Sequence, residues 1–128
     1  MIYIDTSALL KLVHPEPESA PLRAWLADHP GDLVSSALVR TETRRALLRN
    51  DPGVLPSLPA VLSVIAQIPV SEAILDAAAM LPDPMLRSLD AIHLASAQAV
   101  AAVTTMLAYD KRLADASRLA GFSVVSPA

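Results

Sequence analysis

Four acidic residues, far apart in the chain, stand among apolar neighbours. They are Asp5, Glu42, Asp90 and Asp110. An unpaired carboxylate on a core-facing surface costs on the order of several kcal/mol, and few basic residues are placed to compensate all four. A hard divalent cation would satisfy them together. Oxygen ligands without cysteine or an obvious histidine cluster favour Mg²⁺ or Mn²⁺ over zinc. Such a centre supports phosphate-ester chemistry, because the ion polarises a phosphoryl oxygen and generates hydroxide, so that no side-chain nucleophile is needed.

Each acid also has a purely structural explanation when taken singly. Asp5 and Asp110 each follow a strand-like apolar run and precede a helix-like segment, so each suits an N-cap. Glu42 lies inside a predicted helix, on a mostly apolar stripe, where the alternative is a Glu–Arg pair on a solvated face. Asp90 opens an uncharged helix whose dipole would stabilise it. The four acids together favour the metal site.

Short apolar runs alternate with helix-like segments along the chain. We expect strands at residues 2–4, 33–34, 65–70, 103–108 and 122–125, and helices at 6–13, 18–28, 37–49, 73–81, 88 to about 100 and 110–120, with a proline-interrupted helical stretch after residue 53. Apolar strands separated by helices predict a parallel sheet with helices on both faces, an α/β fold. Sites in such sheets form beyond the carboxyl ends of the strands, where Asp5 and Asp110 emerge.

Composition limits the remaining possibilities. The length of 128 residues without a linker suits one domain, and 53 % hydrophobic residues suffice for one core. The chain has no cysteine and its first residues do not read as a secretion signal, which fits a cytoplasmic protein. Residues 91–109 lack charge, but their polar side chains and mixed composition predict a helix followed by a strand, and no membrane span. The net charge is −3, of which the four acids contribute −4, so the rest of the chain is slightly basic.

Several segments resemble one known family. Residues 1–9 resemble the opening of the PIN-domain toxins of the VapC type, residues 89–97 are similar to their central motif, and residues 110–113 with 120–127 resemble their C-terminal end. Residues 35–42 fit the segment that carries the second acid, more loosely. The matches follow the family's order over nearly the whole chain.

This resemblance implies a single PIN-like domain over residues 1–128, with a three-layer α/β/α fold and a central, mostly parallel sheet. It implies an endoribonuclease that depends on Mg²⁺ or Mn²⁺, an RNA substrate, a cognate antitoxin that inhibits it, and a homodimer. Asp5 and Asp90 match the family's most constant metal ligands, Glu42 its second acid and Asp110 its fourth. Thr6 or Ser7 matches a hydroxyl beside the first ligand. Many relatives carry Thr two places before the fourth acid, and Ala108 in this chain cannot supply that hydrogen bond.

Basic residues and one histidine accompany the acids. Arg45 and Arg49 share the predicted helix of Glu42, and Arg87 precedes Asp90 by one turn, so we expect them to contact RNA phosphates. For the first two, a solvated basic face or a surface for an acidic antitoxin segment fits equally well. We expect His93 to be a hydrogen-bonded structural histidine rather than a general base.

Two rival functions stay open. One is a catalytically silent PIN-like domain that only binds a partner or RNA. The other is an α/β phosphohydrolase with Asp5 as nucleophile, which is disfavoured because Ser7 stands where its second aspartate belongs. The sequence does not determine which RNA is cleaved, which antitoxin binds, or whether one or two ions are held.

Overall fold

The core of the molecule is a five-stranded sheet in which every pairing is parallel. The computed structural model describes the whole chain, Met1–Ala128. The strands are β1 (Ile2–Ile4), β2 (Leu33–Ser36), β3 (Ile65–Ile68), β4 (Thr105–Leu107) and β5 (Ser123–Val125). They lie in the order β3-β2-β1-β4-β5, so β1 and β4 are neighbours at the centre although a hundred residues separate them. The expected parallel sheet is confirmed.

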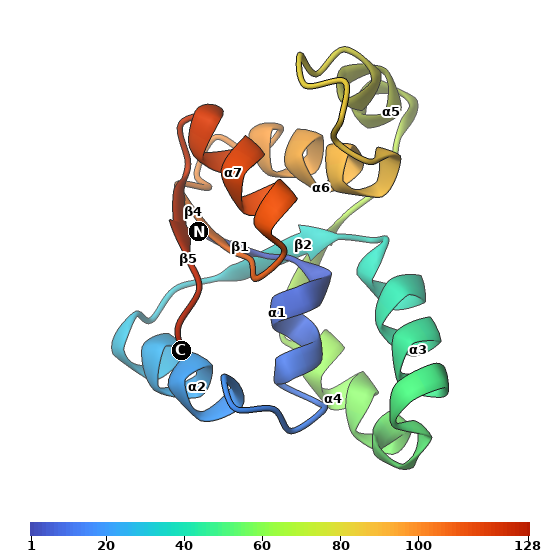
Figure 1. Cartoon of the computed structure of the whole chain (residues 1–128), viewed down its shortest axis with the longest axis vertical. Coiled ribbons are helices and arrows are strands. Elements are labelled where there is room, and N and C mark those ends of the chain that lie inside the picture. The colour runs from blue at the N-terminus through green and yellow to red at the C-terminus, as the bar shows by residue number, and fades with distance from the viewer.

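Helices cover both faces of this sheet. They are α1 (Thr6–Lys11), α2 (Ser19–Asp28), α3 (Val39–Asn50), α4 (Leu58–Ser63), α5 (Glu72–Ala79), α6 (Ser88–Gln98) and α7 (Lys111–Leu119), with a 3₁₀ helix, η1 (Pro52–Ser57), before α4. Helices α5, α6 and α7 lie on one side of the sheet, and α1 to α4 lie on the other (Figure 1). This is the predicted three-layer α/β/α arrangement.

Strand β1 supplies side chains to both layers. Ile2 and Ile4 pack into the larger hydrophobic cluster together with Leu9 of α1, whereas Tyr3 packs into a second cluster beside Leu94 of α6. Successive side chains of a strand point to opposite faces, so this division follows from the strand geometry. Tyr3 therefore lies under α6, completely buried.

Two helix boundaries differ from the sequence-based expectation, and the first of them changes the position of a site residue. Helix α3 begins at Val39 instead of residue 37, because pairing with β3 keeps the chain extended through Ser36 and the Ala37 amide donates to the Ile68 carbonyl. Glu42 consequently lies in the first turn of α3 and not within its middle. The second difference is at α1, which ends at Lys11 and not at residue 13.

The uncharged segment 91–109 forms most of α6 and then β4, a helix followed by a strand as expected. None of the helices combines the length and apolar character needed to span a bilayer.

Candidate functional site

The four predicted acids meet at the carboxyl edge of the sheet. Strands β1 and β4 end side by side there, joined by a hydrogen bond of 3.1 Å from the Asp5 amide to the Leu107 carbonyl. A pocket of about 220 Å³ opens at this edge, and all four acids line it, together with Thr6, Ser7, Leu10 and His93. Asp5 caps α1 and Asp110 caps α7. Glu42 lies in the first turn of α3, and Asp90 lies in the first turn of α6. Four helix N-termini thus face the pocket with the positive ends of their dipoles.

Asp5 is the buried acid at the floor of this pocket, with 3 % of its surface exposed. One carboxylate oxygen, Oδ1, caps α1 by accepting from the Ala8 amide at 3.0 Å, and it also accepts from the Ser7 hydroxyl at 2.7 Å. Ser7 in turn accepts from the Tyr109 amide at 2.9 Å. The predicted capping role is therefore real, but it uses one oxygen and leaves Oδ2 without a protein partner.

Burial raises the pKa of the Asp5 carboxyl to about 6, against the opposing effect of the hydrogen bonds from Ser7 and Ala8. The nearby charge of Asp110 raises it further. A raised pKa means that the negative charge lacks sufficient compensation from the protein.

Asp90 and Asp110 complete one side of the pocket. Asp110 caps α7 by accepting from the Leu113 amide at 3.0 Å. Asp90 is half-buried in the first turn of α6, and burial, followed by the charge of Asp110, raises the pKa of its carboxyl. No lysine or arginine forms an ion pair with any of the four acids.

Glu42 is held differently, by side chains instead of backbone amides. Its Oε1 accepts from His93 Nε2 at 2.6 Å and from the Thr6 hydroxyl at 2.9 Å. The alternative explanation for Glu42, a pair with an arginine on a solvated face, is not what the structure shows, since its partner is a buried histidine. No protein group donates to Oε2.

His93 continues into a chain of buried hydrogen bonds. Its Nδ1 lies 2.7 Å from the Tyr3 hydroxyl, which itself accepts from the Ser36 amide at 3.0 Å. His93 is hydrogen-bonded, as predicted, through both ring nitrogens, and 2 % of its surface is exposed. Sequence reasoning missed Tyr3; the available signal was a hydroxyl in the middle of an otherwise apolar strand.

The donor set of this pocket suits a hard divalent cation. Carboxylate oxygens without hydrogen bonds, raised pKa values and the lack of cationic partners leave negative charge that such an ion would compensate. As the side chains stand, however, no three His, Asp or Glu groups are close enough to hold a metal ion. A bound ion would therefore be held by one or two carboxylates together with water, or by carboxylates that have drawn together.

Comparison with known proteins places this geometry in a family. A family model described as PIN domain matches residues 2–119. Ribonuclease VapC35 of Mycobacterium tuberculosis is 43 % identical over 131 residues, which cover 99 % of this chain and 97 % of the relative. The chain belongs to the PIN-domain family. Ribonuclease VapC47 of the same organism is 40 % identical to this PIN domain over 132 residues, which cover 99 % of this chain and 97 % of the relative.

Solved structures share the PIN-domain architecture. The crystal structure of VapC20 of Mycobacterium tuberculosis, described as a sarcin–ricin loop cleaving toxin, has a TM-score of 0.76 at 20 % identity, covering 99 % of this chain and all of that chain. A toxin–antitoxin complex from Klebsiella pneumoniae has a TM-score of 0.76 at 22 % identity, with 100 % and 98 % coverage. At these identities the likeness establishes the fold.

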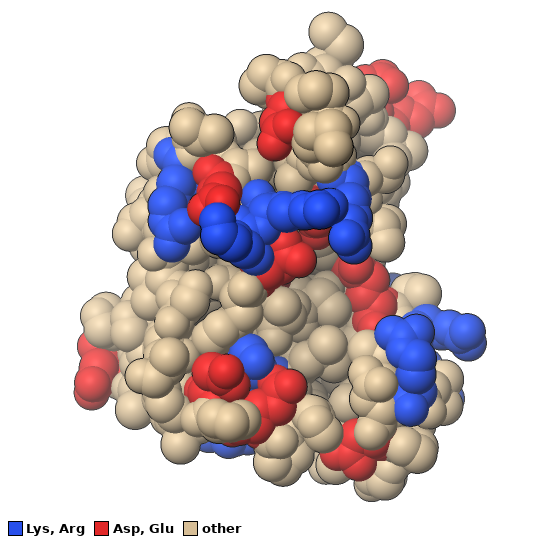
Figure 2. All heavy atoms as spheres, viewed as in Figure 1, with Lys and Arg blue, Asp and Glu red and all other residues tan.

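Basic side chains border the acidic pocket of this PIN domain. Figure 2 shows lysines and arginines gathered over α7 and the adjoining end of α6, with acidic side chains beside them, and a second basic group over α3. Arg87 precedes α6, is exposed, and its charge opposes the rise in the pKa of Asp90. Arg45 and Arg49 are exposed on α3 and form no ion pair. The structure places all three predicted RNA-contacting residues on the surface, with Arg87 electrostatically linked to the acids.

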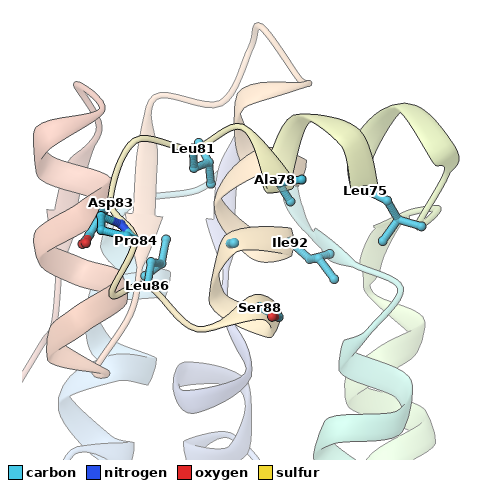
Figure 3. Close-up of a pocket in the computed structure, with 10 residues that line it drawn as sticks. Leu75, Ala78, Leu81, Asp83, Pro84, Leu86, Ser88 and Ile92 are labelled. Carbon is cyan, nitrogen blue, oxygen red and sulfur yellow. The ribbon is translucent and has the colours of Figure 1, made fainter.

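A second hollow lies apart from the acids. About 340 Å³ in volume, it is bounded by α5, the loop 80–87 and α6, and its lining is mainly apolar (Figure 3). Leu75 belongs to this lining and is 46 % exposed, and the neighbouring Met80 and Met85 are more exposed still. Asp83 is the one acidic residue in its lining, which contains none of the four acids of the acidic pocket and no basic side chain. This groove is therefore unsuited to metal-dependent chemistry.

Proposed function

We propose that this PIN domain is an endoribonuclease that depends on Mg²⁺ or Mn²⁺ and hydrolyses RNA phosphodiester bonds with water as the nucleophile. The observation that carries the proposal is the convergence of Asp5, Glu42, Asp90 and Asp110 on one pocket in which no lysine or arginine neutralises them. The names of the VapC relatives, each called a ribonuclease, support RNA as the substrate.

In this proposal the four carboxylates hold the metal ion through oxygens that the protein leaves unpaired. A bound ion of this kind supplies Lewis acidity toward a phosphoryl oxygen and lowers the pKa of bound water. Ser7 and the Ala8 amide keep Asp5 oriented, and the Thr6 hydroxyl donates to Glu42 from the same helix. In-line attack by water would leave a 5′-phosphate and a 3′-hydroxyl.

The basic borders of the pocket would position the RNA. Arg87 lies on the α6 side, and Arg45 and Arg49 lie on α3, so phosphates on both sides of the scissile bond would meet a cationic side chain (Figure 2). Contacts of this type set the register of the strand without reading its sequence.

We further propose that the enzyme acts in the cytoplasm as the toxin of a toxin–antitoxin pair, inhibited by a cognate antitoxin, and that it forms a homodimer. Solved structures of the same fold are toxins and a toxin–antitoxin complex, which supports the first part. The exposed apolar side chains around the groove of Figure 3 support a protein partner, because such surface is normally buried in an interface. Light scattering on the purified chain tests the dimer.

The nuclease assay compares cleavage of RNA with Mg²⁺, with Mn²⁺ and with EDTA, for the wild type and for Asp5→Asn and Asp90→Asn. We expect EDTA and each substitution to reduce cleavage by at least ~100-fold, the loss typical of removing a group that stabilises the transition state. Asp115→Asn is the matched control, since Asp115 is exposed and pairs only with Lys111 and Arg118. Undiminished cleavage by both pocket variants would remove the proposed role.

A silent PIN domain that binds RNA or a partner is the second candidate. It is favoured by the finding that no three acids are positioned to ligate an ion without moving. Calorimetric titration with Mn²⁺ separates the two functions, because the nuclease must bind the ion and a silent domain need not.

A further inference from the structure

Two buried polar side chains, Tyr3 and His93, take no part in the reaction proposed above. Both are at most 2 % exposed, and together they link β1 and α6 to Glu42. We propose that Tyr3 and His93 are positioning residues that fix Glu42 in the pocket and thereby set the affinity of the site for its divalent ion. The proposal rests on the metal-dependent function and gives these two residues a role that acts through Glu42, although His93 also lines the pocket.

Glu42 needs such support more than the other acids do. Asp5 and Asp110 have short side chains, each held by a backbone amide of the helix that it caps. Glu42 has one more rotatable bond, and no backbone amide donates to it. Without donors from other elements, its carboxylate would sample several rotamers.

The donors follow one another in a fixed direction. The Ser36 amide donates to the Tyr3 oxygen, so the tyrosine's own hydrogen is available for His93 Nδ1. Because Nδ1 accepts, the neutral ring carries its hydrogen on Nε2, which donates to Glu42 Oε1 at 2.6 Å. Each link therefore determines the next.

The chain of bonds also selects which Glu42 oxygen stays available. His93 and Thr6 both approach Oε1, at 2.6 and 2.9 Å, and none of the protein's donors reaches Oε2. Both ring nitrogens of His93 have partners, so the ring has no nitrogen left to take a proton from a substrate water. Its geometry suits orientation of Glu42.

The test is the affinity of the full-length, metal-free protein for Mn²⁺, measured by calorimetry on the wild type and Tyr3→Phe. We expect Tyr3→Phe to weaken Mn²⁺ binding 10- to 100-fold, the range for residues that orient metal ligands. Two controls should stay within two-fold of the wild type. Tyr109→Phe removes a tyrosine hydroxyl bonded to the Pro127 carbonyl, and Thr43→Val removes a buried hydroxyl on the Glu42 helix itself.

A double substitution shows whether Tyr3 acts through Glu42. Tyr3→Phe should weaken Mn²⁺ binding in the wild type but change it little in a Glu42→Gln background, because the residue that it positions no longer serves as a ligand. Thermal unfolding of every variant establishes that each is folded at the temperature of titration. A structural role alone would lower the melting temperature of Tyr3→Phe and leave its affinity unchanged.

The tautomer of His93 gives a readout that needs no metal. Nitrogen NMR of the metal-free wild type should find the hydrogen on Nε2, and Tyr3→Phe should change the Nδ1 signal. Finding the hydrogen on Nδ1 alone would overturn the proposed direction of donation. Mn²⁺ binding by the wild type with equal or tighter binding by Tyr3→Phe would overturn the positioning role alone, whereas no binding by the wild type would overturn the metal-dependent function as well.

Discussion

The acids of this pocket are anchored in two different ways. Asp5 and Asp110, at the ends of neighbouring strands, are held by amides of their own helices within three residues. Glu42, across the pocket, is held by side chains from α1 and α6 that are 36 and 51 residues away in sequence. The first kind of anchor is a local property of a strand–Asp–helix junction. The second exists only once three helices, α1, α3 and α6, have packed together.

The largest effect is expected from Asp5, on the backbone-anchored side of the pocket, and it concerns how the free energy of unfolding changes with pH. Because burial raises the pKa of Asp5 to about 6, the folded protein retains a proton there that the unfolded chain has released. The contribution of this proton to the free energy of unfolding is fully present below about pH 4 and is lost as the pH rises through 6. A shift of this size corresponds to about 3 kcal/mol.

Urea unfolding at pH 4.5 and 7.5 measures this contribution by comparing the metal-free wild type with Asp5→Asn. The asparagine keeps an acceptor for the Ser7 hydroxyl and the Ala8 amide. We expect Asp5→Asn to be more stable than the wild type at pH 7.5, and the advantage to shrink at pH 4.5. An advantage independent of pH would contradict the titration of Asp5. Mn²⁺ should recover stability in the wild type at pH 7.5, since it favours the charged carboxylate.

The two anchors should also differ in what their loss costs. His93→Leu leaves the Tyr3 hydroxyl without its acceptor and deprives Glu42 of its closest donor, and we expect it to cost about 3 kcal/mol. Ser7→Ala leaves the Ala8 amide bonded to Asp5 but removes the acceptor of the Tyr109 amide, so we expect a cost of about 1 to 2 kcal/mol. Chemical denaturation at one pH compares them. Equal costs would mean that the buried chain through His93 has no special weight.

The same distinction explains what could be predicted from the sequence. The parallel sheet and the meeting of Asp5 with Asp110 follow from apolar strands that end in an acid before a helix, which is information within a few residues. The partners of Glu42 do not. His93 Nε2 and the Thr6 hydroxyl reach it because α1, α3 and α6 pack at particular distances, and tertiary packing of this kind leaves no local pattern.

The misplaced start of α3 has a similar origin. Propensity allowed a helix from Ala37, but pairing of Ser35 and Ser36 with β3 keeps that segment extended. Cross-strand hydrogen bonds thus outweighed local preference. The consequence was functional, because it moved Glu42 into a first turn, beside the other helix N-termini.

At Asp110 the capping and metal-binding roles can be separated by substitution. Asparagine caps a helix as well as aspartate does, so Asp110→Asn should leave the stability within about 0.5 kcal/mol, whereas Asp110→Ala should cost about 1 kcal/mol. Both should lose RNA cleavage if the carboxylate is a ligand. Thermal unfolding and the nuclease assay together decide this. Full cleavage by Asp110→Asn would reduce Asp110 to a cap.

The smallest effect is expected on the Glu42 side, from the exposed arginines of α3. Arg49 lies on the last turn of α3, with no ion pair to lose, so Arg49→Gln should leave stability unchanged. If Arg49 contacts an RNA phosphate, the affinity of the variant for every RNA sequence should fall a few-fold, and the slope of log affinity against log salt should decrease by about 1 in magnitude.

Arg23→Gln on α2 is the control for Arg49→Gln. The Arg23 guanidinium donates to the Leu12 carbonyl, and Arg23 does not belong to the lining of the acidic pocket. Filter binding at several salt concentrations with EDTA present excludes cleavage during the measurement. An unchanged slope for Arg49→Gln would remove Arg49 from the proposed phosphate contacts and leave Arg45 and Arg87.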